Sequence, residues 1–410
     1  MGAMGKPLMR IPYTDVLPAP TIRPPSAGTF AGALAALHDF FAAPAHGGLP
    51  ASTAVLTGAG LSVASGLADY RGTNGTYRVN KTYRPIYYHE FLASHEARKR
   101  YWARSYLGWS ALHKAQPNAG HHAVGDLGRL GLVSGVITQN VDSFHAKAHP
   151  EIPTLELHGY LRSTVCTSCW NEFPREAFQG QLAKLNPLWA AFLLEAIASG
   201  ALDTENPAEE RARGIRMNPD GDVEVPDAPY TTFRYPACPT CLTSPPPLAD
   251  GTKGVVEVDR DGAWSPASSA GILKPAVVMF GESISHRVKH EAEEAIDGAG
   301  RLLVLATSLA TYSAWRLAKR AKDRGMPIAI VNMGGVRGED AFFAGLDPQQ
   351  LGGQGLRVEM STESLLPALA AELRRSGFRG TSSPLPAGTG AGVARLNQSD
   401  SAAPFKDMLS

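Results

Sequence analysis

The chain has 410 residues and almost no net charge, +1 from 39 Lys and Arg against 38 Asp and Glu. Hydrophobic residues make up 44% and charged residues 19%, a balance typical of a globular protein that buries a core. With no strong positive field and no apolar run long enough to cross a bilayer, we expect neither direct nucleic-acid binding nor a membrane segment.

Strands and helices are predicted to alternate after a proline-rich arm at residues 1–26. Apolar residues recur at helical spacing from Phe30 to Phe41, and an apolar strand at 53–57 runs into a glycine turn. Further strands are predicted at 133–138, 276–280, 301–305, 327–331 and 356–360, with helices at 285–296, 312–324 and 362–375. This order predicts an α/β fold built on a doubly wound, parallel, Rossmann-like sheet.

One segment interrupts the alternation. Residues 161–271 carry four cysteines and scattered Pro, Asp and Glu, and their last part, 242–271, is rich in Pro, Gly and Ser. We expect a small inserted module with 242–271 as a surface loop, and a Rossmann-like domain made of 27–160 and 272–375. The Ser-, Gly-, Ala- and Pro-rich tail at 376–410 is expected to be disordered.

The four cysteines form two C-x-x-C pairs, Cys166 with Cys169 and Cys238 with Cys241, and no cysteine is left over. Two such knuckles supply four thiolates for a tetrahedral ion and leave no open coordination position. A redox motif needs only one pair. The sequence therefore predicts one structural zinc ion per chain.

Polar or glycine residues follow several predicted strands, where ligands of open α/β sheets bind. Gly58-Ala59-Gly60 fits a pyrophosphate site, although a plain strand-to-helix turn is as good an interpretation. Gln139-Asn140-Val141-Asp142 fits a ribose or amide site and equally a helix N-cap cluster. The groups at 280–282, 306–309 and 331–332 are consistent with one crevice along the same edge.

His158 lies just before the first cysteine pair, at the junction of the sheet domain and the inserted module. A lone histidine is more often structural than catalytic. A cleft between domains is nevertheless where substrates bind, and imidazole titrates near neutral pH. His158 is therefore a candidate general base.

Taken in order, these motifs resemble the sirtuin family. The resemblance covers about residues 30–372 and rests on GAGLSVASGLADYRG (58–72), TQNVD (138–142), LHG (157–159), the cysteine pairs, the run at 274–281, ATSL (306–309) and Asn332. The stretches 84–91, 101–109, 116–124, 185–189 and 218–223 resemble the family's class II branch. Ala68 stands where the family has proline, Ala306 replaces a glycine, and the 242–271 insert is longer than usual.

The resemblance implies an NAD-dependent protein-lysine deacylase that releases nicotinamide and O-acyl-ADP-ribose. It assigns His158 as the base on a ribose hydroxyl, with Asn140 and Asp142 lining the nicotinamide pocket. The residues it assigns to NAD are Gly58, Ala59, Gly60, Ser62, Ser65, Gly66, Asp69, Tyr70, Arg71, Tyr77, Gln139, Asn140, Asp142, Thr307, Ser308 and Asn332. The acylated peptide is expected to add as a strand beside Phe280, Gly281 and Glu282. Tyr101 and Arg104, three apart in YWAR, would line the acyl pocket.

Other functions remain open at this point. A mono-ADP-ribosyltransferase would use the same NAD site, and an acyl-peptide sensor would need no base. Arg104 fits either an acidic acyl group or an internal carboxylate, and the acyl group is not determined by the sequence. The class II resemblance favours a mitochondrial location over a nuclear or cytoplasmic one, and we expect a monomer that binds acyl-lysine proteins.

Overall fold

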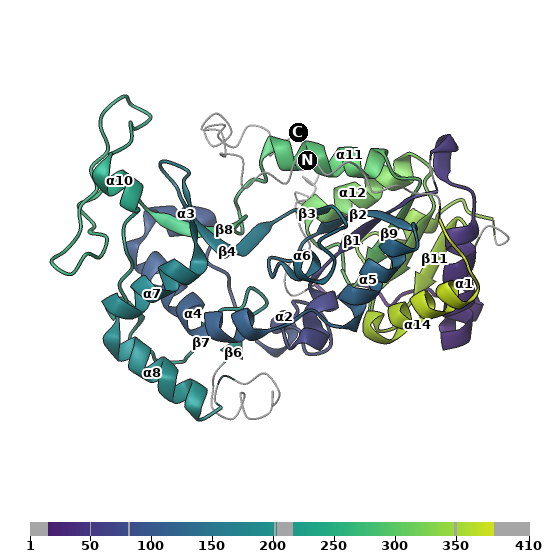
Figure 1. Cartoon of the computed structure of the whole chain (residues 1–410), viewed down its shortest axis with the longest axis horizontal. Coiled ribbons are helices and arrows are strands. Elements are labelled where there is room, and N and C mark those ends of the chain that lie inside the picture. The colour runs from purple at the N-terminus through teal and green to yellow at the C-terminus, as the bar shows by residue number, and fades with distance from the viewer. Residues whose placement is uncertain are drawn as a thin grey trace, which may run out of the picture.

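The computed structural model describes residues 15–49, 51–80, 83–200, 202, 216–347 and 351–380. Most of the arm predicted at 1–26 and nearly all of the tail predicted at 376–410 therefore lie outside the described residues. The described part forms two lobes that lie side by side, with the parallel sheet in one and the cysteine pairs in the other (Figure 1). No described helix combines the length and apolar character needed to cross a membrane.

The larger lobe contains a six-stranded sheet in the order β11-β10-β9-β1-β2-β3. Every neighbouring pair in it is parallel. Its strands are β1 (Thr53–Thr57), β2 (Val133–Thr138), β3 (Thr154–Glu156), β9 (Arg301–Leu305), β10 (Ile328–Val331) and β11 (Gly355–Val358). The strand order reverses direction at β1, so the expected doubly wound sheet is confirmed.

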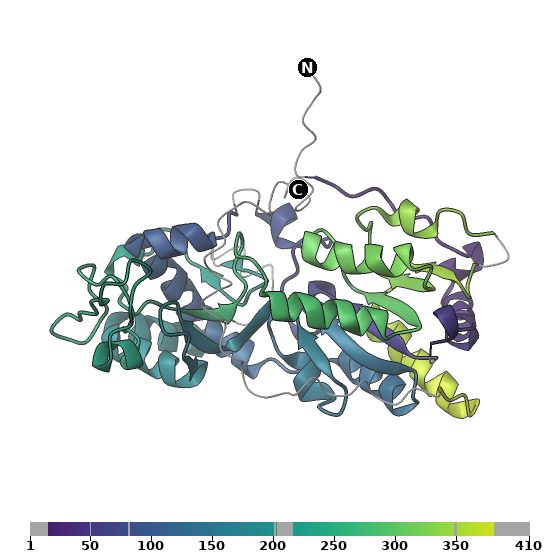
Figure 2. The same ribbon diagram turned by 90° about the horizontal axis from the view of Figure 1, so that it is seen from above.

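Helices cover both faces of this sheet because alternate strand residues point to opposite sides. Val55 packs with α1 (Phe30–Ala42), α5 (Ala119–Arg129) and α14 (Thr362–Arg375). Its neighbours Ala54 and Leu56 pack on the other face with α11 (His286–Asp297), α12 (Tyr312–Asp323) and α13 (Glu339–Phe343). The green helices α11 and α12 lie along that face in Figure 2.

The smaller lobe has its own hydrophobic core around a three-stranded antiparallel sheet in the order β5-β4-β8. Its strands are β4 (Gly159–Cys166), β5 (Glu172–Pro174) and β8 (Leu273–Val277), with a separate hairpin of β6 (Arg216–Met217) and β7 (Val223–Glu224). Its helices are α3 (Tyr88–Ala93), α4 (His95–Lys114), α7 (Arg175–Leu185), α8 (Pro187–Ala198) and α10 (Pro239–Thr243). Of two further short helices, α2 (Thr76–Val79) precedes α3 in the chain, and α6 (Phe144–Ala148) lies between β2 and β3 of the larger lobe.

Two elements lie elsewhere than their sequence positions suggested. The strand expected at 276–280 is observed at Leu273–Val277 and pairs antiparallel with β4, so it belongs to the small sheet and not to the parallel one. Helices α3 and α4 fall within the predicted sheet domain at 27–160. Phe91 and Trp102 on them nevertheless pack in one cluster with Phe178 and Leu182 of α7. Residues before the insert therefore complete the core of the small lobe.

Candidate active site and zinc centre

Three neighbouring strands end together at the expected ligand edge. In the sheet register, Thr57 lies opposite Thr138 on one side and Leu305 on the other. The residues that follow these strand ends are Gly58, Gln139 and Ala306. The parallel sheet thereby brings three motifs, separated by up to about 250 residues in the chain, to one crevice.

The glycine turn after β1 approaches the loop after β9 too closely for side chains. A Cβ on Gly58 would lie 2.6 Å from Thr307 Cβ, and a Cβ on Gly60 would lie 2.9 Å from the Ala306 carbonyl oxygen. Gly66 ends the following 3-10 helix (Ala59–Ser65) with φ +84°, a left-handed conformation. These glycines leave backbone, and not side chains, facing the crevice, as close approach of a dinucleotide requires.

The Gln139 side chain spans the crevice, and both the nitrogen and the oxygen of its carboxamide make hydrogen bonds. Its Nε2 donates to Thr307 Oγ1 at 2.8 Å and to the Thr57 carbonyl at 3.1 Å. Its Oε1 accepts from the Thr311 hydroxyl at 3.0 Å. Gln139 therefore ties β1 to the loop after β9, and a ribose at this point would meet a side chain that is already oriented.

Asn140, Ser62 and Asp142 form a second polar group beside it. Asn140 Nδ2 donates to the Gly58 carbonyl and to Ser62 Oγ, both at 3.1 Å, while the Ser62 hydroxyl donates to Asp142 Oδ2 at 2.6 Å. Burial raises the pKa of Asp142, and the hydrogen bond from Ser62 opposes that shift. Buried, hydrogen-bonded amide and carboxyl groups of this kind suit recognition of a carboxamide.

His158 lies two residues after the end of β3 and directly before β4, where the chain enters the small lobe. Its Nδ1 is 3.1 Å from the Gln139 carbonyl oxygen, which can only accept, so Nδ1 carries the proton. Nε2 then carries a lone pair and accepts a hydrogen bond from the Ser313 hydroxyl at 2.8 Å. Burial lowers the pKa of His158 to about 4, so the imidazole is a neutral base at physiological pH.

The polar loop at 69–75 contacts an aromatic group that includes Tyr77 and Phe280. Tyr70 stacks near Tyr77 with ring centroids 5.3 Å apart and meets Phe280 edge-on at 6.2 Å. Arg71 lies over the Tyr77 ring at 5.4 Å. Asp69 Oδ2 accepts from the Gly72 amide at 2.9 Å and closes the loop, and burial raises its pKa.

The adenine-side residues of the prediction lie at the ends of β9 and β10. The side chain of Asn332, at the end of β10, donates at 3.0 Å to the carbonyls of Met333 and Gly334 and so shapes its own loop. The Ser308 carbonyl accepts from the Arg337 amide at 2.9 Å. Ser65 Oγ accepts from Asn118, which also holds the Leu61 carbonyl. Ala306 adopts φ +51°, the left-handed region where the family has glycine.

The segment predicted to receive the peptide, residues 280–282, contacts residues of the small lobe through a hydrogen bond and an ion pair. Glu282 Oε2 accepts from the Met279 amide at 2.8 Å and lies 3.2 Å from Lys274 Nζ, and both side chains are buried. Gly281 has φ +83°. The Phe280 carbonyl accepts from the Tyr88 amide at 2.9 Å.

Tyr101 and Arg104 lie on α4, and Arg104 has a partner within the chain. Its Nη2 is 2.5 Å from Asp222 Oδ2, and the guanidinium lies 5.8 Å from the centre of the Tyr83 ring. Nearby, the Tyr70 hydroxyl donates to Asp220 Oδ1 at 2.6 Å. The turn that carries both aspartates packs against α4, because a Cβ on Gly108 would lie 1.9 Å from the Gly221 carbonyl oxygen.

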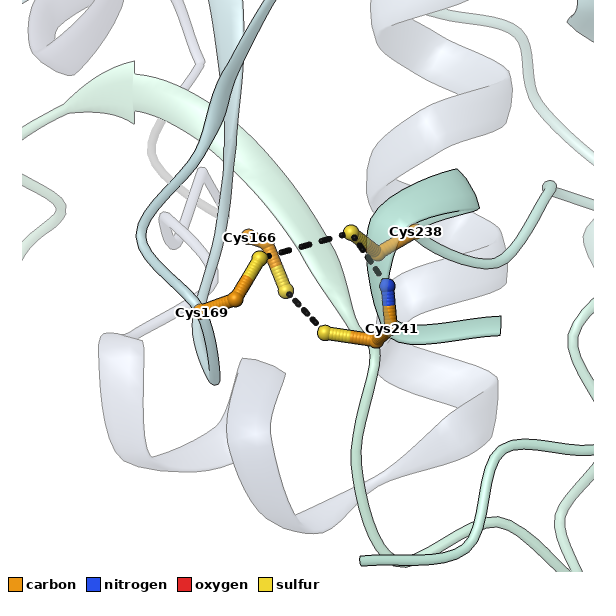
Figure 3. A group of neighbouring side chains, drawn as sticks. All are labelled: Cys166, Cys169, Cys238 and Cys241. Atoms are coloured by element: carbon orange, nitrogen blue, oxygen red, sulfur yellow. Dashed lines mark hydrogen bonds between the residues drawn. The ribbon is translucent and has the colours of Figure 1, made fainter. Parts of the chain in front are cut away.

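The four cysteines converge as predicted (Figure 3). Their Sγ atoms all lie within 4.8 Å of one another, and Cys166–Cys241 and Cys169–Cys238 are each separated by 3.6 Å. Zn–S bonds of about 2.3 Å in a tetrahedron place sulfurs about 3.8 Å apart, far beyond a disulfide length. The donor set therefore fits a closed, structural zinc ion, and it is the only such group of ligands among the described residues.

The fold and the site together define a dinucleotide-dependent α/β enzyme with a base at the crevice and a zinc-stapled second lobe. The sequence pattern of the Sir2 family matches residues 58–313, and this chain belongs to that family.

Curated relatives agree with this assignment, and a solved structure agrees with the fold. NAD-dependent protein deacylase SIR4 of Batrachochytrium dendrobatidis is 38% identical over 330 residues, 78% of this chain and 90% of that protein. NAD-dependent protein deacetylase 1 of Streptomyces coelicolor is 38% identical over 285 residues, 70% of this chain and 78% of its own length. A Sir2 enzyme structure matches with a TM-score of 0.51 and 22% identity, over 84% of this chain and 98% of the solved one, so it supports the fold alone.

Several residues that complete the site were not singled out from the sequence. Ser313 and Thr311 precede or begin α12 and resemble ordinary helix-start residues, yet they contact His158 and Gln139. Asp220 and Asp222 lie in a polar turn whose contact with α4 depends on the fold. Their position in the stretch 218–223, already noted for its resemblance, is the one signal that could have found them.

Proposed function

We propose that this protein is an NAD-dependent protein-lysine deacylase that releases nicotinamide and O-acyl-ADP-ribose. The observation that carries the proposal is the contact of His158 Nδ1 with the Gln139 carbonyl, which leaves Nε2 unprotonated. The next residue, Asn140, belongs to the polar group with Ser62 and Asp142. Membership of the Sir2 family and the names of its 38% identical relatives support the same activity.

The residues divide the chemistry among themselves. NAD, held at the glycine turn and by Gln139, Thr307, Ser308 and Asn332, would supply a ribose carbon that becomes electrophilic as nicotinamide leaves. Asn140 and Asp142 would receive the nicotinamide carboxamide. His158 Nε2 would then take a proton from a ribose hydroxyl in place of the Ser313 hydroxyl, while Nδ1–H stays on the Gln139 carbonyl and stabilises the imidazolium.

Turnover of an acyl-lysine peptide with adenine-labelled NAD tests the proposal. We expect nicotinamide and free-lysine peptide in equal amounts, with the label recovered on a small acyl-ADP-ribose. His158→Ala should abolish both products while the zinc content stays normal. Label retained on protein without lysine release would contradict deacylation and favour the mono-ADP-ribosyltransferase alternative.

For the acyl group we propose a preference for neutral chains. The resemblance places Tyr101 and Arg104 at the acyl pocket, where Arg104 is paired with Asp222 and the Asp220 carboxyl lies close by. One guanidinium faces two carboxyls, so an incoming carboxylate finds no net positive charge. At an effective dielectric near 20, like charges about 5 Å apart repel by about 3 kcal/mol, which removes most of the gain from the arginine.

The pairing can be tested by changing Asp222 alone. In a panel of acetyl-, crotonyl-, succinyl- and glutaryl-lysine peptides, the wild type should favour the neutral groups. Asp222→Asn should shift kcat/KM toward succinyl and glutaryl by about tenfold, because Arg104 loses its anionic partner. Arg104→Met in the same background should remove the shift. A wild type that already prefers the acidic groups would contradict the proposal.

We also propose a mitochondrial location, on the class II resemblance. A fluorescent fusion to the full chain tests the location, and nuclear or cytoplasmic signal would contradict it.

A further inference from the structure

Three buried histidines lie beneath the cofactor crevice and take no part in the chemistry described above. His121 of α5 and His145 and His149 at the two ends of α6 have side chains that are at most 1% exposed. The His121 and His145 rings meet edge-on at 5.1 Å, and His145 and His149 lie 5.0 Å apart. Gly125 makes room for the third ring, since a Cβ there would lie 3.0 Å from His149 Cβ.

Two of these histidines begin a chain of hydrogen bonds that ends at the crevice. His149 Nε2 lies 2.9 Å from His145 Nδ1, and His145 Nε2 lies 3.0 Å from Thr57 Oγ1. The Thr57 hydroxyl donates to Thr138 Oγ1 at 2.8 Å, and Thr138 Oγ1 accepts from the Asn140 amide at 3.1 Å. The chain thus runs from α6, across the ends of β1 and β2, to the backbone of a residue at the nicotinamide pocket.

The direction of this chain fixes the tautomers of both rings. The single hydroxyl hydrogen of Thr57 points to Thr138, so Thr57 Oγ1 can only accept from His145, which therefore carries its proton on Nε2. His145 Nδ1 is then the acceptor for the Nε2–H of His149. Burial lowers the pKa of His145 well below its usual range and also lowers that of His149, which favours the neutral form of both rings.

We propose that His145, supported by His149, is a positioning residue for NAD turnover, acting through Thr57 and Thr138 to hold Asn140 and the Gly58 turn in place. Thr57 directly precedes Gly58, and Asn140 Nδ2 donates to the Gly58 carbonyl, so the chain restrains both sides of one hydrogen bond. Each link between His149 Nε2 and Asn140 is a hydrogen bond, and only the outer Nδ1 of His149 has no partner among the described residues. A buried network of linked hydrogen bonds rigidifies the groups at its end. His145 is only 1% exposed, so in this proposal it acts through Thr57 and not by direct contact with NAD or peptide.

A double-mutant cycle on the purified full-length protein tests this. His145→Leu and Thr57→Val each break the chain, and each should lower kcat/KM for NAD about tenfold, with the KM for the acyl peptide unchanged. The double variant should fall no further, because both changes break the same chain. Thr57→Ser keeps the hydroxyl and should keep activity near wild type, and His145→Gln keeps a donor toward Thr57 and should recover part of the loss.

Additive losses in the double variant, or equal rises in both KM values, would overturn the proposal and leave the histidines as core packing. Nitrogen-15 spectra of the histidines supply a readout that survives if His145→Leu fails to fold. In the wild type, the His145 and His149 rings should both be neutral Nε2–H tautomers from pH 6 to 8. Titration of either ring near pH 6.5 would contradict the chain.

Only the kinetic test of this positioning role rests on the proposed deacylase activity. If the wild type shows no NAD turnover, the proposed function fails, and the spectra still test the hydrogen-bond chain. If the wild type is active and the variants keep its kcat/KM for NAD, the positioning role fails alone.

Discussion

The protonation of His158 is set by one neighbour, the Gln139 carbonyl, and by burial. The Gln139 carbonyl fixes the proton on Nδ1, and burial lowers the pKa to about 4. The acid limb of kcat/KM should therefore fall near pH 4 to 5, well below the ordinary histidine value of about 6.5. A pH–rate profile measured on the folded enzyme checks this, and an acid limb near 6.5 would contradict it.

The same shift affects stability, with a definite sign. A folded-state pKa below the unfolded value means that the folded protein resists protonation of His158. The contribution to stability is present above about pH 6.5 and is lost as the pH falls toward 4. His158→Ala should make the free energy of unfolding depend less on pH, as measured by urea unfolding at pH 5 and at pH 7.5. Turnover by the same variant should fall by at least about a hundredfold.

Ala306 is an alanine in a glycine conformation. Its φ of +51° destabilises a residue with a Cβ by about 1 to 2 kcal/mol. Glycine would remove this strain, but its greater flexibility in the unfolded chain would offset about half of the gain in stability. Ala306→Gly should therefore raise the free energy of unfolding by about 0.5 to 1 kcal/mol, measured by denaturant titration. Ala310→Gly, two residues beyond the loop's Thr-Ser pair, is a comparison that lacks a positive φ. A loss of stability in Ala306→Gly would show that the strain is not there.

At the scale of elements, the zinc centre joins the turn after β4 to the start of α10. Cys166 ends β4, Cys238 caps α10, and Cys241 lies within that helix. α10 has only five residues, too few to be stable alone, so we expect the ion to fix it. The protein should hold one zinc per chain, and Cys241→Ser should lose the metal and lower the melting temperature by 10 °C or more, as an order of magnitude.

Metal analysis with thermal melting checks this expectation. Thr243→Ala changes an exposed residue of the same helix and should leave both values unchanged. A metal-free protein that melts like the wild type would contradict a structural role for zinc.

The strands of the parallel sheet could be predicted because they are short, buried runs made mostly of apolar residues. β1, β2 and β9 occur at the predicted residues, and β10 differs at one end only. The run predicted as a strand at 276–280 is equally apolar, but the observed strand is β8 at Leu273–Val277. Its antiparallel partner β4 lies more than 100 residues away, and nothing local distinguishes the two kinds of pairing. The site followed the same rule. Motifs at strand ends were found, whereas the contacts of His145 with Thr57 and of Tyr70 with Asp220 span 88 and 150 residues and depend on the fold.

For the whole molecule, the turn at 218–222 connects the cofactor loop to the small lobe. Tyr70 binds Asp220 from the cofactor side, and Arg104 binds Asp222 from α4. Both links meet in one turn, so a change in the charge of Asp220 should affect both the cofactor loop and the small lobe.

Burial raises the pKa of Asp220 to about 6; the nearby charge of Asp222 acts in the same direction, and the hydrogen bond from Tyr70 and the charge of Arg104 oppose it. A folded-state pKa above the unfolded value of about 3.9 means that the protonated form is favoured by folding. This contribution is fully present below pH 3.9 and is lost as the pH rises through 6, a change of about 3 kcal/mol. Asp220→Asn should therefore stabilise the protein at pH 7.5 and have little effect at pH 4.5, by urea unfolding at the two values. Tyr70→Phe should destabilise at pH 7.5, because it removes a hydrogen bond that the ionised carboxyl uses. Equal stability of Asp220→Asn and wild type at pH 7.5 would mean that the buried carboxylate carries no penalty and that the turn is not a pH-sensitive link.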